Sequence, residues 1–233
     1  MKTTEKHNHH AFASRALASV ALVLCTFVLL CSTSGCNQRR SSHSLMEDGN
    51  FHFRQGEHEQ AATLYQQIAD RYPGNWEAQY RLGLARLKLG EADAARIALQ
   101  QAHTLQPRND DVAEALADAM FQQGNNNELY AFLRDRANTQ RTTRSYLALA
   151  ENSMRMNDPD TASVATMTAI DVDGGKSVEP YLLRAEFARS IQDQNEALRR
   201  LRQAYGINPR DSRVLEQLRE MGVTDPTMLP PGK

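Results

Sequence analysis

Hydrophobic residues follow two different patterns along this chain of 233 residues. Near the start, residues 16–31 (ALASVALVLCTFVLLC) form one continuous apolar run. Later in the chain, apolar residues recur among polar ones at intervals of three and four, which predicts helices with one buried face. In the segment 212–221 these apolar residues are Val214, Leu215, Leu218 and Met221. The pattern therefore predicts a helical body preceded by a separate apolar segment.

Small residues recur with a period near 34 in the helical part, and such a period indicates a repeat protein. Three glycines are spaced by 34 residues, namely Gly56, Gly90 and Gly124. A slot five residues further along each unit holds Ala61, Ala95, Leu129, Ala162 and Ala197. A third slot, close to the end of the unit, holds Pro73, Pro107 and Pro209.

The order of these slots resembles the tetratricopeptide repeat, most clearly in residues 76–109. This copy holds the family's signature positions, which are Leu82, Gly83, Gly90, Ala95, Leu99, Ala102 and Pro107. The resemblance implies an all-α fold, a right-handed superhelical solenoid of about five helix-turn-helix repeats with a C-terminal capping helix. Small residues such as Gly83 would let two helices approach, and we expect Leu99 and Tyr65 to fill the space between neighbouring units.

We expect the solenoid to span residues 45–221, followed by a disordered tail at 222–233. Its units are expected at about 42–75, 76–109, 110–142, 143–176 and 178–211, with the cap at 212–221. The third and fourth units depart from the repeat. Residues 136–144 contain a single apolar residue, and residues 125–127 (NNN) predict a wider polar turn. These departures indicate either a soft joint or ordinary drift within a regular solenoid.

Residues 1–35 have the features of a secretory signal peptide, with a positively charged start, an apolar core and a small-residue exit. The apolar run is shorter than the roughly 20 residues that a helix needs to cross a bilayer. Residues 33–36 (TSGC) resemble the cleavage box of a bacterial lipoprotein, which implies cleavage before Cys36 and acylation of that cysteine. Residues 36–44 would then form a polar tether. Because Asn37 stands where an aspartate would retain such a protein in the inner membrane, the resemblance favours the periplasmic face of the outer membrane.

Two other interpretations of this segment stay open, namely an ordinary cleaved signal and an uncleaved anchor. The distribution of positive charge does not decide the orientation of an anchor. Positive residues lie on both sides of the apolar run, with Lys2, Lys6 and Arg15 before it and Arg39 and Arg40 after it.

Composition and charge exclude several kinds of function. Lys and Arg number 27 and Asp and Glu number 28, so the net charge of −1 argues against nucleic-acid binding. No cysteine follows Cys36, which excludes a disulfide, a thiolate metal site and a cysteine nucleophile from the folded part. Phosphate-binding loops and nucleophile motifs are also missing. We therefore expect no catalytic residues, metal ions, cofactors or small-molecule substrate.

Two segments have some features of a metal site. His7, His9 and His10 cluster in the segment that we expect to be removed. Residues 171–175 (DVDGG) resemble the start of a calcium loop, but Leu182 stands where the loop needs a bidentate glutamate. We interpret this segment as the connection between the fourth and fifth units.

The family resemblance also implies a concave groove, lined by the first helix of each unit, that binds a peptide or a helix of another protein. The residues expected there combine apolar anchors with both signs of charge, which is typical of protein interfaces. They are Met46, Asn50, Phe53, Arg54, Tyr80, Arg81, Leu84, Leu87, Lys88, Glu114, Asp118, Phe121, Gln122, Leu147, Glu151, Met154 and Arg155, with Leu182, Glu186 and Arg189 in the last unit. The carboxylate clamp of chaperone-binding members is disfavoured, because Asn50 fits it but Met46 replaces a required lysine.

The sequence therefore predicts a non-enzymatic scaffold, lipid-anchored through Cys36 on the exported side of a bacterial membrane. Its layout resembles repeat lipoproteins of envelope assemblies, such as a pilus, a secretion apparatus or outer-membrane protein assembly. One alternative is an accessory protein or enzyme of cell-wall or polysaccharide metabolism. Another is a cytosol-facing adaptor with an uncleaved anchor.

Overall fold

The computed structural model describes residues 40–223. The chain divides into two compact units, residues 1–41 and 42–233, and nearly all described residues belong to the second. The expected signal peptide, Cys36 and residues 224–233 of the expected tail lie outside the described residues. Within residues 40–223, no helix is both long enough and apolar enough to span a membrane.

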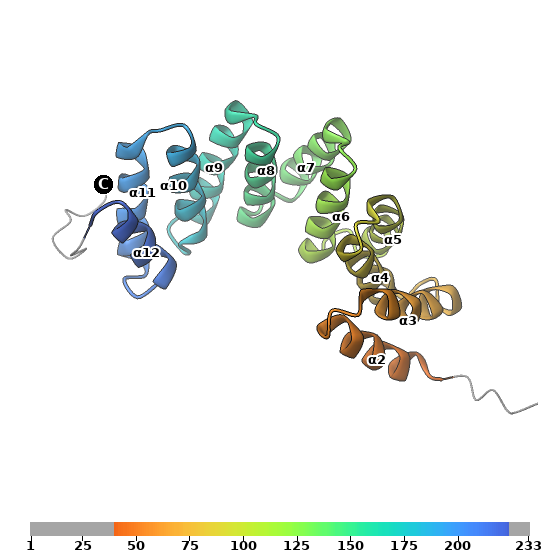
Figure 1. Cartoon of the computed structure of the whole chain (residues 1–233). Coiled ribbons are helices and arrows are strands. Elements are labelled where there is room, and N and C mark those ends of the chain that lie inside the picture. The colour runs from red at the N-terminus through yellow and green to blue at the C-terminus, as the bar shows by residue number, and fades with distance from the viewer. Residues whose placement is uncertain (1–39, 224–233) are drawn as a thin grey trace, which may run out of the picture. The chain divides into compact units, whose positions relative to one another are not determined.

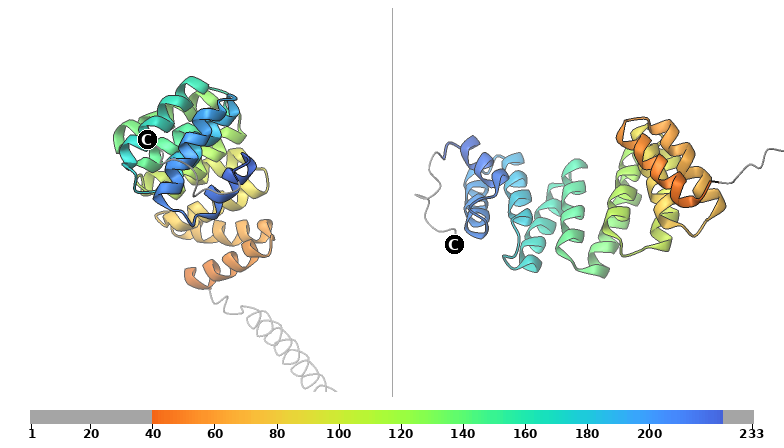
Figure 2. Two further views of the ribbon diagram at one scale, coloured as in Figure 1. Left: turned by 90° about the vertical axis from the view of Figure 1, so that its left-hand side faces the viewer. Right: turned by 90° about the horizontal axis from the view of Figure 1, so that it is seen from below.

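The described residues form eleven α-helices and no strand, which confirms the all-α expectation. They are α2 (Ser42–Arg54), α3 (His58–Arg71), α4 (Trp76–Lys88), α5 (Ala92–Leu105), α6 (Asp110–Gln122), α7 (Asn126–Gln140), α8 (Thr143–Arg155), α9 (Pro159–Asp173), α10 (Glu179–Ser190), α11 (Gln194–Ile207) and α12 (Ser212–Glu220). Helices α2 to α11 form five consecutive pairs, and α12 follows the last pair (Figure 1). Figure 2 shows the same succession of pairs from two other sides.

The first helices of successive pairs form one side of this stack. In the middle of the stack, contacts join α4 to α6, α6 to α8 and α8 to α10, whereas α5 with α7 and α7 with α9 have fewer contacts among the described helices. Because the first helices lie closer together than the second ones, the stack curves toward them. We call the surface formed by the exposed side chains of α2, α4, α6, α8, α10 and α12 the concave surface.

Each pair turns at one residue with a positive φ angle. This residue is a glycine in the first three pairs, with φ between 74° and 79°, and Asn157 and Gln192 take the same place in the last two. Glycine adopts this conformation without the steric cost that a side chain adds. The third turn is no wider than the second, which corrects the expectation for residues 125–127. Asn125 donates its amide to the Met120 carbonyl, just as Glu91 donates to the Arg86 carbonyl in the second turn, and α7 already begins at Asn126.

Glycine in the first helix brings the two helices of a pair into close contact. A methyl group on Gly83 would lie 2.4 Å from Cγ of Leu99, and one on Gly49 would lie 2.6 Å from Cε1 of Tyr65. Leu99 and Tyr65 are fully buried, and Leu99 also joins the core cluster that contains Leu116 of the next pair. The expectation that these side chains fill the space between units was therefore incomplete, because each also packs between the two helices of its own pair.

Two boundaries differ from those expected from the sequence. Helix α2 begins at Ser42, so residues 42–44 belong to the first helix rather than to a tether. At the other end, Val223 packs against the cluster that contains Val214 and Leu218, and its amide donates to the Leu218 carbonyl at 3.0 Å. Residues 222–223 therefore complete the end of α12 and are not part of a free tail.

The polar stretch 136–144 is held in the structure by specific polar contacts. Arg136 is buried, forms an ion pair with Asp110 and donates Nη1 to the Pro107 carbonyl at 3.1 Å. Thr142 caps the start of α8 in a capping box, in which its hydroxyl accepts from the Ser145 amide and the Ser145 hydroxyl accepts from the Thr142 amide. Nevertheless, α6 and α7 contact each other less extensively than the helices of the other pairs. A soft joint at this place stays a prediction.

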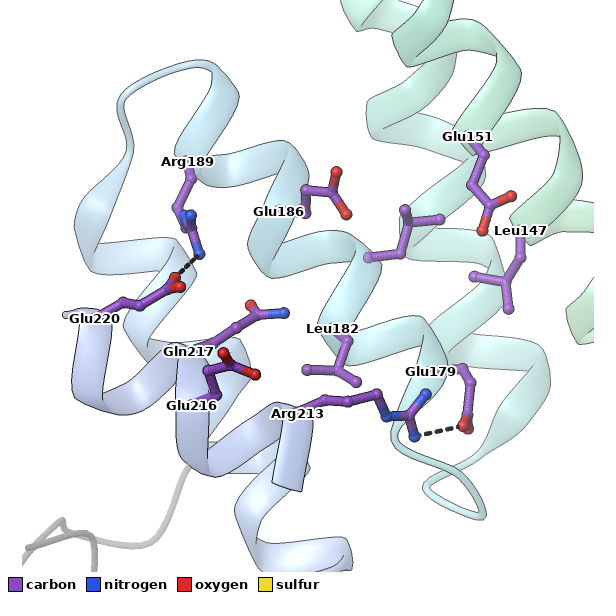
Figure 3. Close-up of a pocket in the computed structure, with 11 residues that line it drawn as sticks. Leu147, Glu151, Glu179, Leu182, Glu186, Arg189, Arg213, Glu216, Gln217 and Glu220 are labelled. Carbon is purple, nitrogen blue, oxygen red and sulfur yellow. Dashed lines mark hydrogen bonds and ion pairs between the residues drawn. The ribbon is translucent and has the colours of Figure 1, made fainter. Parts of the chain in front are cut away.

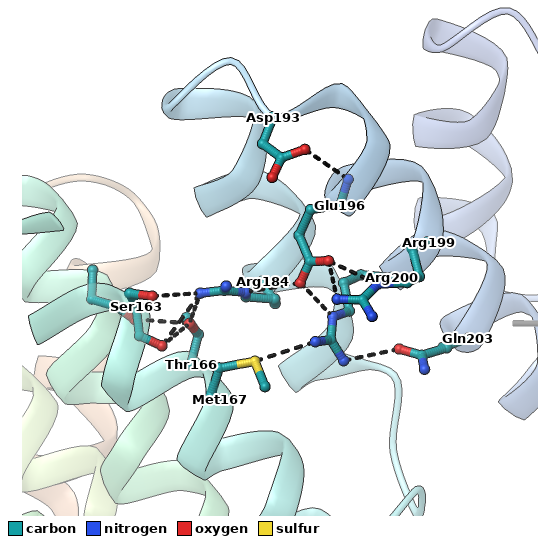
Figure 4. Close-up of polar contacts among 10 residues, drawn as sticks. Ser163, Thr166, Met167, Arg184, Asp193, Glu196, Arg199, Arg200 and Gln203 are labelled. Carbon is teal, nitrogen blue, oxygen red and sulfur yellow. Dashed lines mark hydrogen bonds and ion pairs between the residues drawn. The ribbon is translucent and has the colours of Figure 1, made fainter. Parts of the chain in front are cut away.

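A buried ionic network holds the last two pairs together (Figure 4). Glu196 at the start of α11 accepts from Nε of Arg200 at 2.8 Å and forms a longer ion pair with Arg184 of α10 at 3.3 Å. Arg184 in turn donates to Oγ1 of Thr166 on α9 at 3.1 Å. Burial raises the pKa of Glu196, but hydrogen bonds from Arg200 and Arg199 outweigh it and lower that pKa to about 2.

Replacing Gly83 by alanine tests the close contact. We expect Gly83→Ala to lower the free energy of unfolding by about 1–3 kcal/mol, because Leu99 is buried and cannot move away from the new methyl group. Urea unfolding followed by circular dichroism measures the change. Gly74→Ala is the control, since nothing lies within 4 Å of its new methyl group. Equal stability of the two variants would contradict the close contact.

The ionic network should make stability depend on acid pH. The folded pKa of Glu196 is below its ordinary value, so its stabilisation is complete above about pH 4.5 and is lost as the pH falls toward 2. We expect Glu196→Gln to cost about 3 kcal/mol at pH 7, because Arg184 and Arg200 lose their buried partner. The difference from the parent should shrink between about pH 4.5 and pH 2. Urea unfolding of the parent and the variant at several pH values tests this prediction, with the exposed Glu59→Gln as control. A difference in the free energy of unfolding that does not change with pH would contradict it.

Candidate functional site on the concave surface

At the N-terminal end of the concave surface, several predicted residues take part in the fold itself. The amide oxygen of Asn50 accepts a hydrogen bond from the Tyr65 hydroxyl at 2.8 Å, so it is already occupied. Met46 and Phe53 are partly buried against the core cluster that contains Tyr65. Of the predicted residues on α2, Arg54 is the most clearly solvent-facing.

Helix α4 contributes both anchors and charge. Tyr80, Leu84 and Leu87 are partly buried against the central core cluster, and each keeps part of its side chain at the surface. Burial, and then the carboxylate of Asp111, raise the pKa of Tyr80. Lys88 keeps part of its side chain at the surface as well. Helix α4 therefore offers a partly exposed aromatic side chain and, two turns further along, the positive charge of Lys88.

In the middle of the concave surface, α6 and α8 are joined by arginine–carboxylate pairs. Nη1 of Arg155 lies 2.7 Å from Oδ1 of Asp118, and its guanidinium lies 3.8 Å from the centre of the Phe121 ring. Nε of Arg144 lies 2.6 Å from Oε1 of Glu114. Three of the predicted residues, Glu114, Asp118 and Arg155, are thus paired with one another or with a neighbour, and Phe121 is covered by Arg155 instead of being free as an anchor.

At the C-terminal end, α8, α10 and α12 enclose a pocket of about 620 Å³ (Figure 3). It brings together five predicted residues, which are Leu147, Glu151, Leu182, Glu186 and Arg189. The other lining residues are Glu179, Leu183, Arg213, Glu216, Gln217 and Glu220. A smaller pocket of about 390 Å³ shares Leu147, Glu151 and Glu179 and continues toward Glu114 on α6.

The two arginines of the larger pocket are already paired within it. Nη1 of Arg189 lies 3.1 Å from Oε2 of Glu220, and Nη2 of Arg213 lies 2.9 Å from Oε1 of Glu179 (Figure 3). Both pairs connect α10 to α12. They therefore fix the last helix at the end of the concave surface.

Sequence reasoning missed the contribution of α12 to this pocket. The sequence predicted α12 only as a cap, whereas its exposed residues Arg213, Glu216 and Glu220 also line the pocket. Helix α12 begins 33 residues after α10, as the first helix of a sixth unit would. Extending the repeat period past Asp211 would have predicted another first helix at this place, and with it these three pocket residues.

The segment with the start of a calcium loop has a structural role. Oδ2 of Asp173 accepts from the amides of Lys176 and Ser177 at 2.7 and 2.9 Å, and Oδ1 accepts from the Ser177 hydroxyl. These hydrogen bonds close the connection between α9 and α10, as we interpreted it. Among residues 40–223, no group of three or more metal-binding side chains is positioned to hold an ion.

Comparisons with known proteins agree with this architecture. The sequence pattern described as tetratricopeptide repeat matches residues 49–110. No curated protein gives a significant match to the sequence. The solved structure of TTC0263, a thermophilic TPR protein from Thermus thermophilus, is 19% identical with a TM-score of 0.57, and the match covers 77% of this chain and 98% of that chain. MamA from Desulfovibrio magneticus RS-1 is 14% identical with a TM-score of 0.55, over 73% of this chain and 97% of that chain.

At these identities, the likeness to solved structures shows the fold alone. The repeat sequence is recognised directly only in the first part of the helical region, residues 49–110. The same helix pairing continues to α11. Together, the comparisons show that residues 49–110 match the tetratricopeptide-repeat pattern and that the described helices share the fold of solved tetratricopeptide-repeat proteins.

Proposed function

We propose that this chain is a non-enzymatic scaffold that binds a segment of another protein along its concave surface. Stacked helix pairs bury their apolar faces against each other and leave an extended concave surface, which repeat proteins use for binding. The observation that carries the proposal is the pocket between α8, α10 and α12, which is lined by leucines and charged side chains together. Tyr80 and Lys88 extend the candidate surface toward the N-terminal end.

We also propose that the scaffold is lipid-anchored through Cys36 on the exported side of a bacterial membrane, within an envelope assembly. The support is the sequence of residues 33–36 and the apolar run before it. More than one acyl chain on a single cysteine gives stable anchoring, since each buried methylene contributes about 0.8 kcal/mol. The periplasmic face of the outer membrane is the location that Asn37 favours.

Substitution of Tyr80 by alanine and Arg81 by glutamate should weaken partner capture. The changes remove an aromatic contact and reverse a charge on the concave surface, so we expect the immobilised variant to retain several-fold less partner from a membrane extract. Quantitative mass spectrometry of the captured proteins measures the loss. Thermal unfolding must show that the variant is folded, because Tyr80 is partly buried.

The matched control carries Ile97→Ala and Arg108→Glu. Ile97 is 61% exposed on α5, away from the concave surface, and Arg108 is exposed in the connection after it. This variant should capture partners as the parent does. Equal capture by all three proteins would show that the concave surface is not where the partner binds.

The anchor has a test of its own. Intact mass of the membrane-extracted protein should show loss of residues 1–35 and the addition of acyl chains. Cys36→Ser should abolish both changes, because the thiol is the acylated group. A full-length, unmodified mass would overturn the lipid anchor and leave the apolar run as a retained membrane segment.

A further inference from the structure

Negative charge is in excess in the pocket between α8, α10 and α12. Five glutamates and two arginines line it. The arginines pair with Glu220 and Glu179, as described above. The remaining carboxylates, those of Glu151, Glu186 and Glu216, form no hydrogen bond or ion pair with any residue between 40 and 223. Figure 3 shows them at three edges of the same pocket, on three different helices.

The pocket has an apolar floor between these carboxylates. Leu182 and Leu183 are 8% and 9% exposed, and Leu147 is partly exposed beside them. Gln217 reaches into the same space, and its Oε1 is shielded from solvent without accepting a hydrogen bond from the described residues. The pocket therefore combines an apolar contact area, an acceptor that lacks a donor, and unbalanced negative charge.

The carboxylate of Glu151 lies near other carboxylates. Loss of surrounding water, and then the carboxylates of Glu114 and Glu186, raise the pKa of Glu151, and the charge of Arg155 offsets this only in part, even though Glu151 is an exposed residue. Like charges held close together destabilise a folded protein unless a cation compensates them. Elsewhere on the concave surface an arginine of this chain fulfils that role, as Arg144 does beside Glu114.

We propose that this pocket binds a segment of the partner that carries Lys or Arg side chains next to an apolar residue. This inference rests on the proposed function and specifies the chemistry of the partner. The apolar residue would pack on Leu182 and Leu147, and the cationic groups would reach Glu151, Glu186 and Glu216.

Three synthetic peptides of one length test the inference. They share the same leucines and differ only in their polar positions, which are Lys, Gln or Glu throughout. Fluorescence anisotropy with the full chain in a neutral detergent should show binding of the Lys peptide, weaker binding of the Gln peptide and none of the Glu peptide. Affinity for the Lys peptide should fall as salt is raised, because the charge contacts are partly exposed.

A triple variant locates the binding site. Glu151→Gln, Glu186→Gln and Glu216→Gln together should weaken binding of the Lys peptide roughly tenfold, since three weak charge contacts are lost at once. The control is Glu59→Gln, Asp135→Asn and Asp171→Asn, which makes the same change in net charge at exposed positions of α3, α7 and α9. This control should bind as the parent does, apart from a small change in long-range attraction.

Several outcomes would overturn the inference. One is equal binding of the three peptides, and another is equal weakening of binding by the triple variant and its control. A third is self-association of the chain that only the triple variant abolishes, because the occupant of the pocket would then be a second copy of this chain. If none of the peptides binds while Tyr80→Ala with Arg81→Glu still reduces capture from membrane extract, the inference fails and the proposed function stands. If that capture is unaffected as well, both fail.

Discussion

The close approach of the two helices within a pair, made at a glycine in the first two pairs, is the constraint on which the rest of this molecule depends. Gly83 leaves room for Leu99 directly over the backbone of α4, and Gly49 does the same for Tyr65 over α2. A pair packed this closely presents its large side chains to the next pair, so pairs stack and share one core. The contacts among first helices then curve the stack, and the curvature produces the concave surface and its pocket. The candidate site is therefore a consequence of repeated packing along the whole array.

The sequence predicted the features that repeat and missed those that occur once. The 34-residue glycine spacing located three of the turns, because a positive φ angle has a recognisable residue preference. Gln192 takes the same conformation without that signal. The polar stretch around Arg136 suggested a break, yet a carboxylate and a carbonyl 26 and 29 residues away satisfy that arginine. Pairing at such separations depends on how the units stack, and a residue pattern within one unit does not contain that information.

The same limit applies to the concave surface. Assigning groove positions by repeat phase brought Leu147, Glu151, Leu182, Glu186 and Arg189 into one pocket. It did not reveal that the guanidinium of Arg155 covers the Phe121 ring, or that the Tyr65 hydroxyl donates a hydrogen bond to Asn50. The position of a residue within the repeat predicts which way its side chain points. Whether the side chain is free depends on its neighbours in the adjacent unit, so the middle of the surface is internally satisfied while the C-terminal end is not.

Helix α12 also determines how this molecule can associate. It takes the place of the first helix of a sixth unit, and among the described helices no second helix follows it. Its apolar residues Val214 and Leu218 are buried against α11, which leaves polar side chains on the outer face. Another helical repeat stacking end to end would have to remove water from that polar face without gaining apolar contact. At the opposite end, Phe51 of α2 remains 52% exposed. The two ends of the described array therefore differ in chemistry, because α12 presents polar side chains outside its buried face whereas α2 carries an exposed aromatic side chain.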